Sequence, residues 1–366
     1  MFDTIVVGGG PAGSVTALVL ARAGERVLLL EAKSCLSFKV GESLPPAIKP
    51  LLRDLGLWDS FVADGHLACY GNQSAWSSST LRSTEFIKDP HGHGWHLDRP
   101  RFDATLRNAA RHAGVCVHEE SKVVEVRRAR KTFEVELGAH GNVRGRWLAD
   151  CTGRLSLVAR QQGVRRVKHD SLVAFVTLFA TRTTESEFDS DSATLVESAP
   201  EGWWYTALLP SRKRVVVYHT DAGTSSSSLA RTICGYRSLL HRTKHIRAKI
   251  SRHGYVFPGR PKAAAANSAR LEKFHGDDWI AAGDSALSFD PLSSQGILTA
   301  IYAGLKAGQT LIARKAGDEG ALGRYGERME SIYAAYLAQR HSFYGYEQRW
   351  SGKDFWKRRH DGTLPK

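Results

Sequence analysis

The amino-acid sequence predicts an α/β protein in which a Rossmann-like dinucleotide-binding domain is interleaved with a second, mainly β-sheet domain. Three observations support this fold class. A glycine-rich turn joins an apolar run to a helical one at the start of the chain, and two further strand-to-glycine turns follow much later. The segments between these turns include several strand-like runs. The chain has 366 residues, more than one small core usually holds, so two joined domains are expected.

The first glycine-rich turn reads Gly8-x-Gly10-x-x-Gly13. In a dinucleotide site the first glycine suits the tight turn, the second lets a pyrophosphate approach the backbone, and the third lets helix and strand pack closely. The start of the helix also presents free N–H groups to the phosphates. Gly24 ends this helix, and the next buried strand ends at Glu31, near the spacing of the acidic residue that binds the adenosine ribose.

Apolar spacing and the positions of glycine and proline predict the remaining elements. Pro100 suits the first turn of a helix. The expected elements are a helix over 48–57, strands within 66–86, a helix from Arg99, strands at 115–117, 123–126, 133–137 and 147–150, strands at 171–181, 202–205 and 214–220, a polar helical stretch at 228–251, a strand at 278–281, and helices at 295–314 and 322–346.

The third turn, from Gly283 onward, indicates which dinucleotide is bound. Asp284 is placed to accept hydrogen bonds from sugar-alcohol hydroxyls such as those of a ribityl chain. A helix then begins at Gly296 and Ile297, where free N–H groups favour an anion such as the pyrimidine edge of a reduced flavin. Pro291 would lie near the reactive edge of that ring. The sequence therefore predicts FAD.

Three segments together resemble the FAD fingerprints of flavoprotein monooxygenases with the p-hydroxybenzoate-hydroxylase fold, over residues 1 to about 310. They are Gly8 to Gly13, Asp150-Cys-Thr-Gly153, and Gly283-Asp284 with its following Asp-Pro pair. The resemblance implies an FAD-binding domain interleaved with a β-sheet substrate domain. It implies as cofactor-binding residues Gly8, Gly10, Ala12, Gly13, Glu31, Ala32, Glu42, Ser43, Arg101, Val123, Asp150, Gly153, Gly283, Asp284, Pro291, Gly296 and Ile297, with Glu31 on the adenosine ribose, Arg101 along the FAD chain and Asp284 on the ribityl and pyrophosphate region.

Within that fold, Gly41-Glu-Ser43 and the segment 99–103 resemble the tryptophan-halogenase branch. Halogenases of this branch carry a Trp-x-Trp-x-Ile-Pro motif and a catalytic lysine. Here Gly202-Trp-Trp-Tyr205 has a different spacing, and the segment 70–76 contains no lysine. Together these strings look more like the flavoprotein maturases of tryptophylquinone cofactors, of the lysine-epsilon-oxidase and glycine-oxidase maturation type.

This resemblance implies an FAD-dependent monooxygenase that hydroxylates an aromatic ring, with a tryptophan side chain of a partner oxidase precursor as the expected substrate. The cofactor would carry the chemistry, and the protein would position and shield it. Pro291, Trp203 and Tyr205 are the candidate catalytic residues, although aromatic residues of 202–205 also suit the core of a sheet. No second glycine-rich motif is visible, so NAD(P)H would bind transiently or a separate flavin reductase would supply electrons.

Three alternatives stay open. The first is a small-molecule aromatic hydroxylase or halogenase of a biosynthetic pathway. The second is an isoprenoid-type FAD reductase, against which the polar, tryptophan-rich middle region argues. The third is a non-catalytic, FAD-stabilised chaperone that holds the oxidase precursor.

The formal net charge of +14 suits an acidic protein partner. There is no nucleic-acid-binding motif and no run apolar enough to span a bilayer. The five scattered cysteines are expected to be reduced thiols in a cytoplasmic protein; one of them, Cys35, suits either a covalent flavin anchor or a loop thiol. His91, His93 and His96 are expected to be surface loop residues, and no metal site is predicted.

The domain boundaries follow from these segments. We expect the FAD-binding domain to comprise residues 1–65, 98–165 and 260–320, and the substrate domain to comprise 66–97 and 166–259, with a C-terminal helical segment at 321–366 packed across both.

Overall fold

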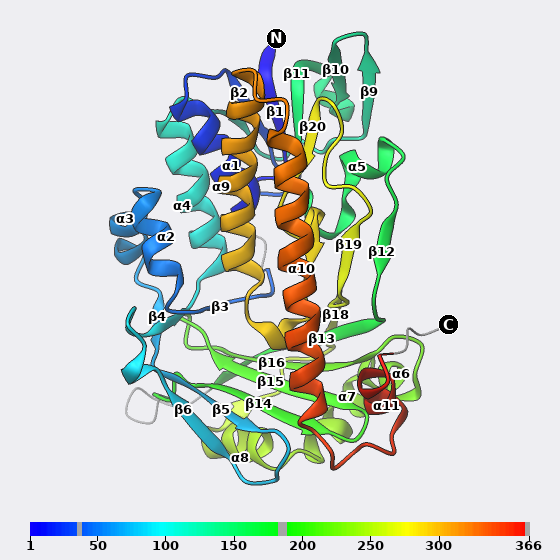
Figure 1. The fold of residues 1–366 in the computed structure, drawn as a ribbon. Coiled ribbons are helices and arrows are strands. Elements are labelled where there is room, and N and C mark those ends of the chain that lie inside the picture. Colours follow the sequence, from blue (N-terminus) through cyan, green and yellow to red (C-terminus); the bar gives the residue numbers. More distant parts are fainter. Residues whose placement is uncertain (35–38, 182–188, 363–366) are drawn as a thin grey trace.

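The computed structural model describes residues 1–34, 39–181 and 189–362, so Cys35 lies outside the described residues. Figure 1 shows an upper part, where long helices cover a sheet, and a lower part built around a second sheet. The helices are α1 (Pro11–Arg22), α2 (Ile48–Asp54), α3 (Trp58–Ala63), α4 (Arg99–His112), α5 (Leu157–Gln161), α6 (Ser225–Ala230), α7 (Ile233–His241), α8 (His245–Arg252), α9 (Gly296–Lys315), α10 (Ala321–Gly345) and α11 (Asp354–His360).

The upper sheet brings the three glycine turns to one edge. Its order is β8 (Cys116–His118), β2 (Val27–Leu30), β1 (Phe2–Val7), β11 (Asn142–Asp150), β10 (Thr132–Glu136) and β9 (Glu125–Ala129), with β20 (Trp279–Ala281) also paired to β11. Strands β1, β11 and β20 are parallel, and Val7, Asp150 and Ala281 lie side by side in register. The turns that follow these three residues therefore meet at the carboxyl end of the sheet, where α/β folds bind their ligands.

Small residues allow α1 and α9 to pack closely beside each other (Figure 1). A Cβ added at Gly304 would lie 2.4 Å from the carbonyl oxygen of Ala12, and one at Gly308 would lie 2.8 Å from the Cβ of Val19. The hydroxyl of Thr16 donates to the carbonyl of Gly304 at 3.1 Å. This contact fixes the start of α1 against the middle of α9.

The second sheet has eight strands, with one apolar cluster on each face. Side chains alternate between the faces, so neighbouring residues such as Trp204 and Tyr205 point to opposite sides. The order is β17 (Tyr255–Val256), β13 (Leu172–Thr181), β16 (Arg214–Asp221), β15 (Gly202–Leu208), β14 (Thr194–Ala199), β5 (Gly71–Ala75) and β6 (Arg82–Glu85), with β18 (Lys262–Ala265) also paired to β13.

Two three-stranded sheets lie outside these two sheets. One has the order β3 (Ser43–Leu44), β7 (Gly94–His96) and β4 (Leu67–Cys69), and the other β12 (Arg166–Lys168), β19 (Ala269–Leu271) and β21 (Leu287–Ser288). Two pairings differ from the expected domain composition. Strand β7 pairs with β3 of the segment 1–65 and also with β4, and β18, expected in the FAD-binding domain, pairs with β13 of the second sheet.

The polar stretch at 228–251 is three helices instead of one, and threonine side chains cap the starts of α6 and α7. Thr224 accepts from the backbone N–H of Ser227 at the start of α6, and Thr232 accepts from that of Gly235 at the start of α7.

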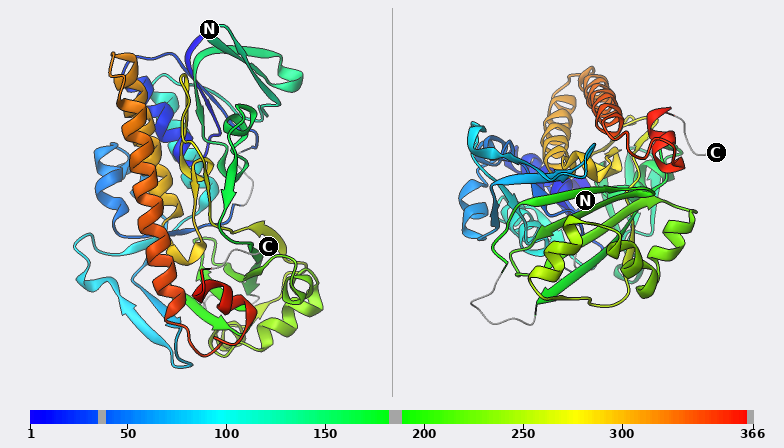
Figure 2. Two further views of the ribbon diagram at one scale, coloured as in Figure 1. Left: turned by 45° about the vertical axis from the view of Figure 1, so that its right-hand side comes forward. Right: turned by 90° about the horizontal axis from the view of Figure 1, so that it is seen from below.

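The C-terminal segment reaches from the upper helices to the second sheet, as Figures 1 and 2 show for α10 and α11. Tyr344 and Trp356 join the apolar cluster of one face of that sheet. Arg358 and Arg359 both pair with Asp221 of β16, at 2.7 and 2.8 Å.

We expect a glycine-to-alanine substitution to change the melting temperature in opposite directions in α9 and in α10. Gly304→Ala should lower the melting temperature, because the added methyl group overlaps the backbone of α1 and such overpacking costs about 1–3 kcal/mol. Gly323→Ala should raise it, because its Cβ meets no atom within 4 Å and alanine favours a helix by about 1 kcal/mol. Thermal unfolding of both variants tests this. The same change in melting temperature in both would contradict the close contact of Gly304 with the backbone of α1.

Candidate cofactor and substrate site

The first glycine turn has the shape of a cradle for an anion. Gly8 has φ +107°, and a Cβ there would lie 2.1 Å from the carbonyl oxygen of Cys151; a Cβ at Gly13 would lie 1.9 Å from that of Gly8. By contrast, a Cβ at Gly10 meets nothing within 4 Å. The chain itself thus requires the first and third glycines, while open space remains at the second, directly before α1. This arrangement fits a pyrophosphate at the helix start.

The end of β2 is tied to the same turn. The Glu31 carboxylate accepts from the N–H groups of Gly9 at 2.8 Å and Lys33 at 3.0 Å. Each carboxylate oxygen retains a further acceptor position, which leaves room for a ribose hydroxyl. Ala32 is exposed beside it, and buried Val123 lies on a loop that the Ser121 N–H ties to the carbonyl of Glu31 at 2.8 Å.

Arg107 of α4 was not identified from the sequence. Its guanidinium is buried and donates to the carbonyl of Gly9 at 3.0 Å and to Glu119 at 2.7 Å. It therefore braces the glycine turn from behind. Its spacing from Asp103, four residues along the same helix, could have indicated a shared inner face.

The two arginines at the start of α4 bond to backbone carbonyls of neighbouring loops, whereas the sequence predicted that Arg101 lies along the FAD chain. Arg101 donates to the carbonyl of Asp64 at 2.7 Å, whereas Arg99 donates to the carbonyls of Val40 and Gly41 at 3.0 and 2.5 Å. Arg99 thus holds the loop that leads to Glu42. A contact of Arg101 with the FAD chain stays a prediction.

The second glycine turn is shaped by Asp150. Its buried carboxylate accepts from the N–H and hydroxyl of Thr152 and from the N–H of Ala159, at 2.7 to 3.1 Å. These bonds use the side chain to fold the turn through Gly153, so its predicted contact with the cofactor stays a prediction.

The third turn packs directly on the first. A Cβ at Gly283 would lie 2.7 Å from the Cβ of Ala12. The next residue, Asp284, has a side chain that is 38% exposed and lies 3.4 Å from Arg154. Its carboxylate keeps acceptor positions for hydroxyls beside the first turn, and its contact with the ribityl chain stays a prediction.

The loop before α9 is open to solvent where the flavin edge is expected. Pro291 and Gly296 are exposed, and a Cβ at Gly296 meets nothing within 4 Å. Ser294 adopts a left-handed conformation with φ +51°, and Ile297 is buried in the first turn of α9. Residue Asp290 closes the loop by accepting from the N–H of Leu292 at 3.0 Å.

A buried network connects this loop to the second sheet. Tyr344 of α10 donates to Asp290 at 2.7 Å and accepts from the indole N–H of Trp203 at 3.0 Å. Burial raises the pKa of Asp290, and Arg340, 3.4 Å away, opposes that rise. The network fixes the Pro291 loop relative to β15.

The predicted catalytic role of Trp203 is corrected by its surroundings. The side chain is only 1% exposed, stacks on His219 at 3.7 Å and is covered by the C-terminal segment. It is a core residue, because the alternation of β15 places it under α10 and not beside open space.

Tyr205 lies on the same face but at the boundary with the FAD-binding part. Its hydroxyl donates to Glu42, which is buried next to β3. Burial raises the pKa of both groups, and the bond from Tyr205 opposes the rise at Glu42. Tyr205 and Leu292 of the Pro291 loop both pack against the apolar cluster of this face.

A polar chain continues from Ser43. Its hydroxyl lies 3.4 Å from that of Thr194, which lies 2.9 Å from Nε2 of His96. His96 Nδ1 lies 2.8 Å from the carbonyl of Leu208, so Nδ1 carries the proton and Nε2 accepts. The expectation that His96 is a surface residue is wrong: it is 0% exposed in β7.

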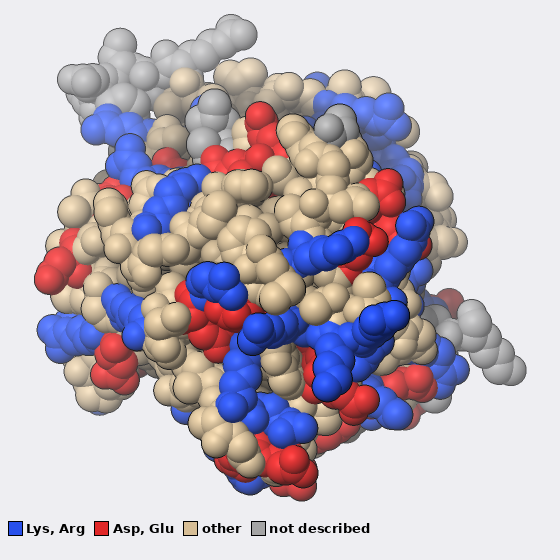
Figure 3. All heavy atoms as spheres, turned by 90° about the horizontal axis from the view of Figure 1, so that it is seen from above, with Lys and Arg blue, Asp and Glu red and all other residues tan. Residues whose placement is uncertain are grey.

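Basic and acidic side chains lie among one another on the surface of the protein. On the upper face, groups of Lys and Arg side chains have Asp and Glu side chains among them (Figure 3). Pairs such as Arg26 with Asp3 and Arg144 with Glu134 neutralise individual basic side chains, and the net excess of positive charge is what such pairs leave over. Within the described ranges, no helix meets the length and hydropathy of a membrane span, and no cluster of potential metal ligands occurs.

Replacement of Gly10 should separate folding from cofactor binding. Gly10→Val fits the described chain, since its φ of −77° suits any residue and its Cβ is unobstructed. We expect an unchanged melting temperature of the cofactor-free protein but at least a tenfold loss of FAD affinity, measured by flavin fluorescence. FAD binding by Gly10→Val with unchanged affinity would contradict a pyrophosphate site at Gly10.

The buried histidine predicts acid sensitivity. Burial lowers the pKa of His96 from 6.5 to about 4, so the unfolded chain binds a proton that the folded chain refuses. Stability from this group is complete above pH 6.5 and falls as the pH drops towards 4, by up to about 3 kcal/mol. Urea unfolding at pH 7 and pH 5 should show this loss, with a smaller loss in His96→Gln. An equal loss of unfolding free energy between pH 7 and pH 5 in the native protein and in His96→Gln would contradict this role of His96.

Comparison with known proteins agrees with this geometry. The FAD binding domain family matches residues 1–339. The putative FAD-dependent oxidoreductase LodB of Marinomonas mediterranea is 30% identical, covering 98% of this chain and 97% of LodB. The flavin-dependent halogenase armH3 of Armillaria mellea is 26% identical, covering 92% of this chain and 72% of armH3.

Solved structures agree on the fold. The myxobacterial chondrochloren halogenase CndH superposes with a TM-score of 0.85 at 24% identity, covering 98% of this chain and 85% of CndH. The peptidyl tryptophan dihydroxylase QhpG, essential for tryptophylquinone cofactor biogenesis, superposes with a TM-score of 0.74 at 24% identity, covering 98% of this chain and 78% of QhpG. The chain therefore belongs to the FAD-binding family of flavin monooxygenases and halogenases with the p-hydroxybenzoate-hydroxylase fold, and it is an FAD-dependent oxidoreductase.

Proposed function

We propose that the protein inserts oxygen into an electron-rich aromatic ring held between the FAD site and the Tyr205 face of the second sheet. The observation that carries this proposal is the composition of that face. Residues that pair across strands β5, β14, β15, β16 and β13 share it, and none of them is a lysine: Ser74, Val196, Ser198, Trp203, Tyr205, Ala207, Val215, Val217, His219, Ala174, Val176 and Leu178.

The position of the lysines argues against halogenation. Halogenases that the sequence resembles use a catalytic lysine, expected here on the segment 70–76, which has none. Within the strand registers of the described residues, a lysine shares this face at Lys262, on β18 opposite Val176. Three strand spacings separate β18 from β15, or roughly 14 Å. Lys262 is therefore remote from Tyr205.

The chain's own residues would position and shield the reaction. The glycine turns, Glu31 and Asp284 would hold FAD, which supplies the oxidative chemistry with O₂ when bound. Apolar residues of the face, Val196 and Val217, exclude water from the ring. The bond from Tyr205 to Glu42 keeps the tyrosine oriented at the edge of this space.

As the substrate we propose a tryptophan side chain of a partner oxidase precursor. Two comparisons support this substrate: the putative FAD-dependent oxidoreductase LodB matches along nearly the whole of both chains, and QhpG, a peptidyl tryptophan dihydroxylase, has the same fold. The net charge of +14 would favour encounter with an acidic precursor.

A small-molecule halogenase or hydroxylase is the second candidate. The comparisons favour it by number, because the matched relatives and structures include several flavin-dependent halogenases. In that case Lys262 would be the lysine to test.

One experiment separates these functions. The precursor is co-expressed with this protein or with its Gly10→Val variant, and its tryptic peptides are weighed. We expect oxygen on a tryptophan with the native protein and none with the variant, because the variant lacks FAD. Modification that persists with the variant would contradict oxygen insertion by this protein, and maturation of the precursor without FAD bound here would favour the chaperone.

A parallel assay supplies the purified protein with reduced FAD, chloride or bromide, and free phenols and indoles. We expect no halogenated product. A halogenated product that disappears in Lys262→Met would overturn the proposal in favour of the second candidate.

A further inference from the structure

The side chain of Arg154 reaches from the second glycine turn to the third. Arg154 belongs to a short 3-10 turn at Gly153–Leu155, and Asp284 belongs to another at Gly283–Ser285. Parallel pairing of β11 with β20 places these two turns side by side at the carboxyl end of the upper sheet. The arginine is 26% exposed, and its Nε lies 3.4 Å from Oδ2 of Asp284. An ion pair therefore joins the two turns.

The other two nitrogens of this guanidinium are anchored to backbone carbonyls. Nη1 donates to Asn267 at 2.6 Å, and Nη2 donates to Phe289 at 3.1 Å. Asn267 lies in the link between β18 and β19, and Phe289 lies two residues before Pro291. The Phe289 ring is itself held by stacking on Tyr336 of α10, with ring centroids 4.3 Å apart. Because the guanidinium is planar, these two bonds also fix the direction of Nε.

The carboxylate of Asp284 has no other anchor. Within residues 1–34, 39–181 and 189–362, no hydrogen bond to this carboxylate occurs, and Arg154 is its ion-pair partner. A carboxylate that is 38% exposed and has no hydrogen bond can adopt several side-chain conformations. A fixed cation beside it favours one of them.

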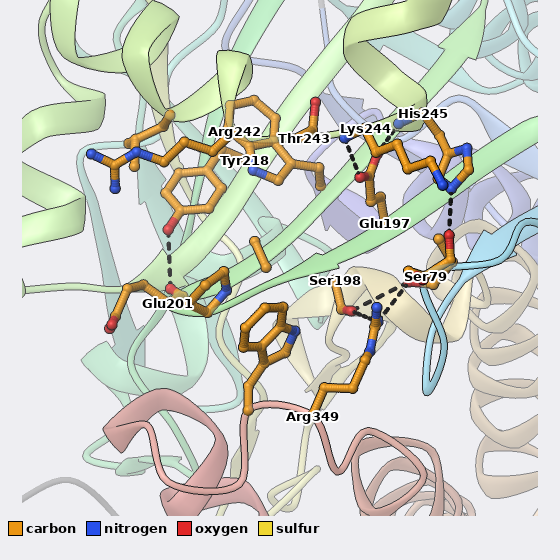
Figure 4. A pocket seen from close by; sticks show the side chains of 16 residues that line it. Ser79, Glu197, Ser198, Glu201, Tyr218, Arg242, Thr243, Lys244, His245 and Arg349 are labelled. Carbon is orange, nitrogen blue, oxygen red and sulfur yellow. Dashed lines mark hydrogen bonds between the residues drawn. The ribbon is translucent and has the colours of Figure 1, made fainter.

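Other acids of the chain are saturated by the protein itself. Asp150 accepts three hydrogen bonds from its own turn and from α5, and Asp290 accepts from its own loop and from α10. Glu197, which lines the cavity of about 260 Å³ shown in Figure 4, accepts from three backbone N–H groups at the start of α8. Asp284 receives no such bonds, so its oxygens remain available to a ligand.

We propose that Arg154 is a positioning residue that orients Asp284 towards the ribityl hydroxyls of FAD. The inference rests on the predicted contact of Asp284 with FAD. The two carbonyls fix the guanidinium, the guanidinium fixes the carboxylate, and the carboxylate accepts the hydroxyls. Since Phe289 belongs to the Pro291 loop, the same arginine also sets the distance between the ribityl acceptor and the loop at the flavin edge.

A double-mutant cycle on FAD affinity tests this role. The FAD-loaded full-length proteins are diluted to equilibrium, and released FAD is measured by flavin fluorescence. We expect Asp284→Asn and Arg154→Met each to weaken FAD binding about tenfold. The double variant should bind FAD within about threefold of Asp284→Asn alone, because the arginine acts through that carboxylate. Losses that multiply in the double variant would overturn the inference, since an arginine that only supports the fold would act independently of Asp284.

Arg154→Lys separates geometry from charge. A lysine keeps the cation but lacks the planar fork, so it cannot bond to both carbonyls while facing Asp284, and we expect FAD binding to weaken about fivefold. Arg165→Met is the matched control, because Arg165 is an exposed arginine that pairs with Glu272 at 2.5 Å. This control should change FAD affinity by less than about twofold.

The outcomes distinguish the inference from the contact on which it rests. Native FAD affinity in Arg154→Lys, or an equal loss in Arg165→Met, would overturn the inference while Asp284→Asn still binds FAD weakly. Native affinity in Asp284→Asn would overturn the predicted ribityl contact and the inference with it.

Discussion

The contact of Ala12 with Gly283 and Gly304 is the constraint on which the rest of the structure depends. The added Cβ distances of 2.7 and 2.4 Å show that only glycine allows α1, the third turn and α9 to meet there. Parallel pairing of β1, β11 and β20 brings the turns to one edge, but this contact sets their separation. A site for one dinucleotide thus arises from segments nearly 300 residues apart in the sequence.

The C-terminal helix provides a second constraint, between the FAD side and the sheet. Asp290, Tyr344 and Trp203 form a buried chain of hydrogen bonds, and Arg340 also pairs with Asp170 at 3.1 Å. Loss of one partner from such a network costs more than the network contributes, because it leaves a buried polar group alone. The position of the Pro291 loop relative to Tyr205 therefore depends on α10.

The fold and the FAD motifs could be predicted because their signals are local. Glycine spacing, the strand before each turn and the proline at the start of α4 are readable over a few residues. The roles of Trp203, Trp204 and Tyr205 could not be predicted in this way. Alternation assigns each side chain to a face of the sheet, but only the packing of α10 and α7 shows what covers each face. Likewise, burial of His96 depends on Thr194 and Leu208, which are distant in sequence.

We propose that three separated turns hold one FAD whose reactive end faces Tyr205 across a lysine-free part of the second sheet. A crystal structure of the FAD-bound protein tests it most directly. We expect the pyrophosphate beside Gly10, the ribityl chain beside Asp284 and the flavin ring between Pro291 and Tyr205. A flavin ring bound away from the second sheet, or a pyrophosphate that does not approach Gly10, would contradict it.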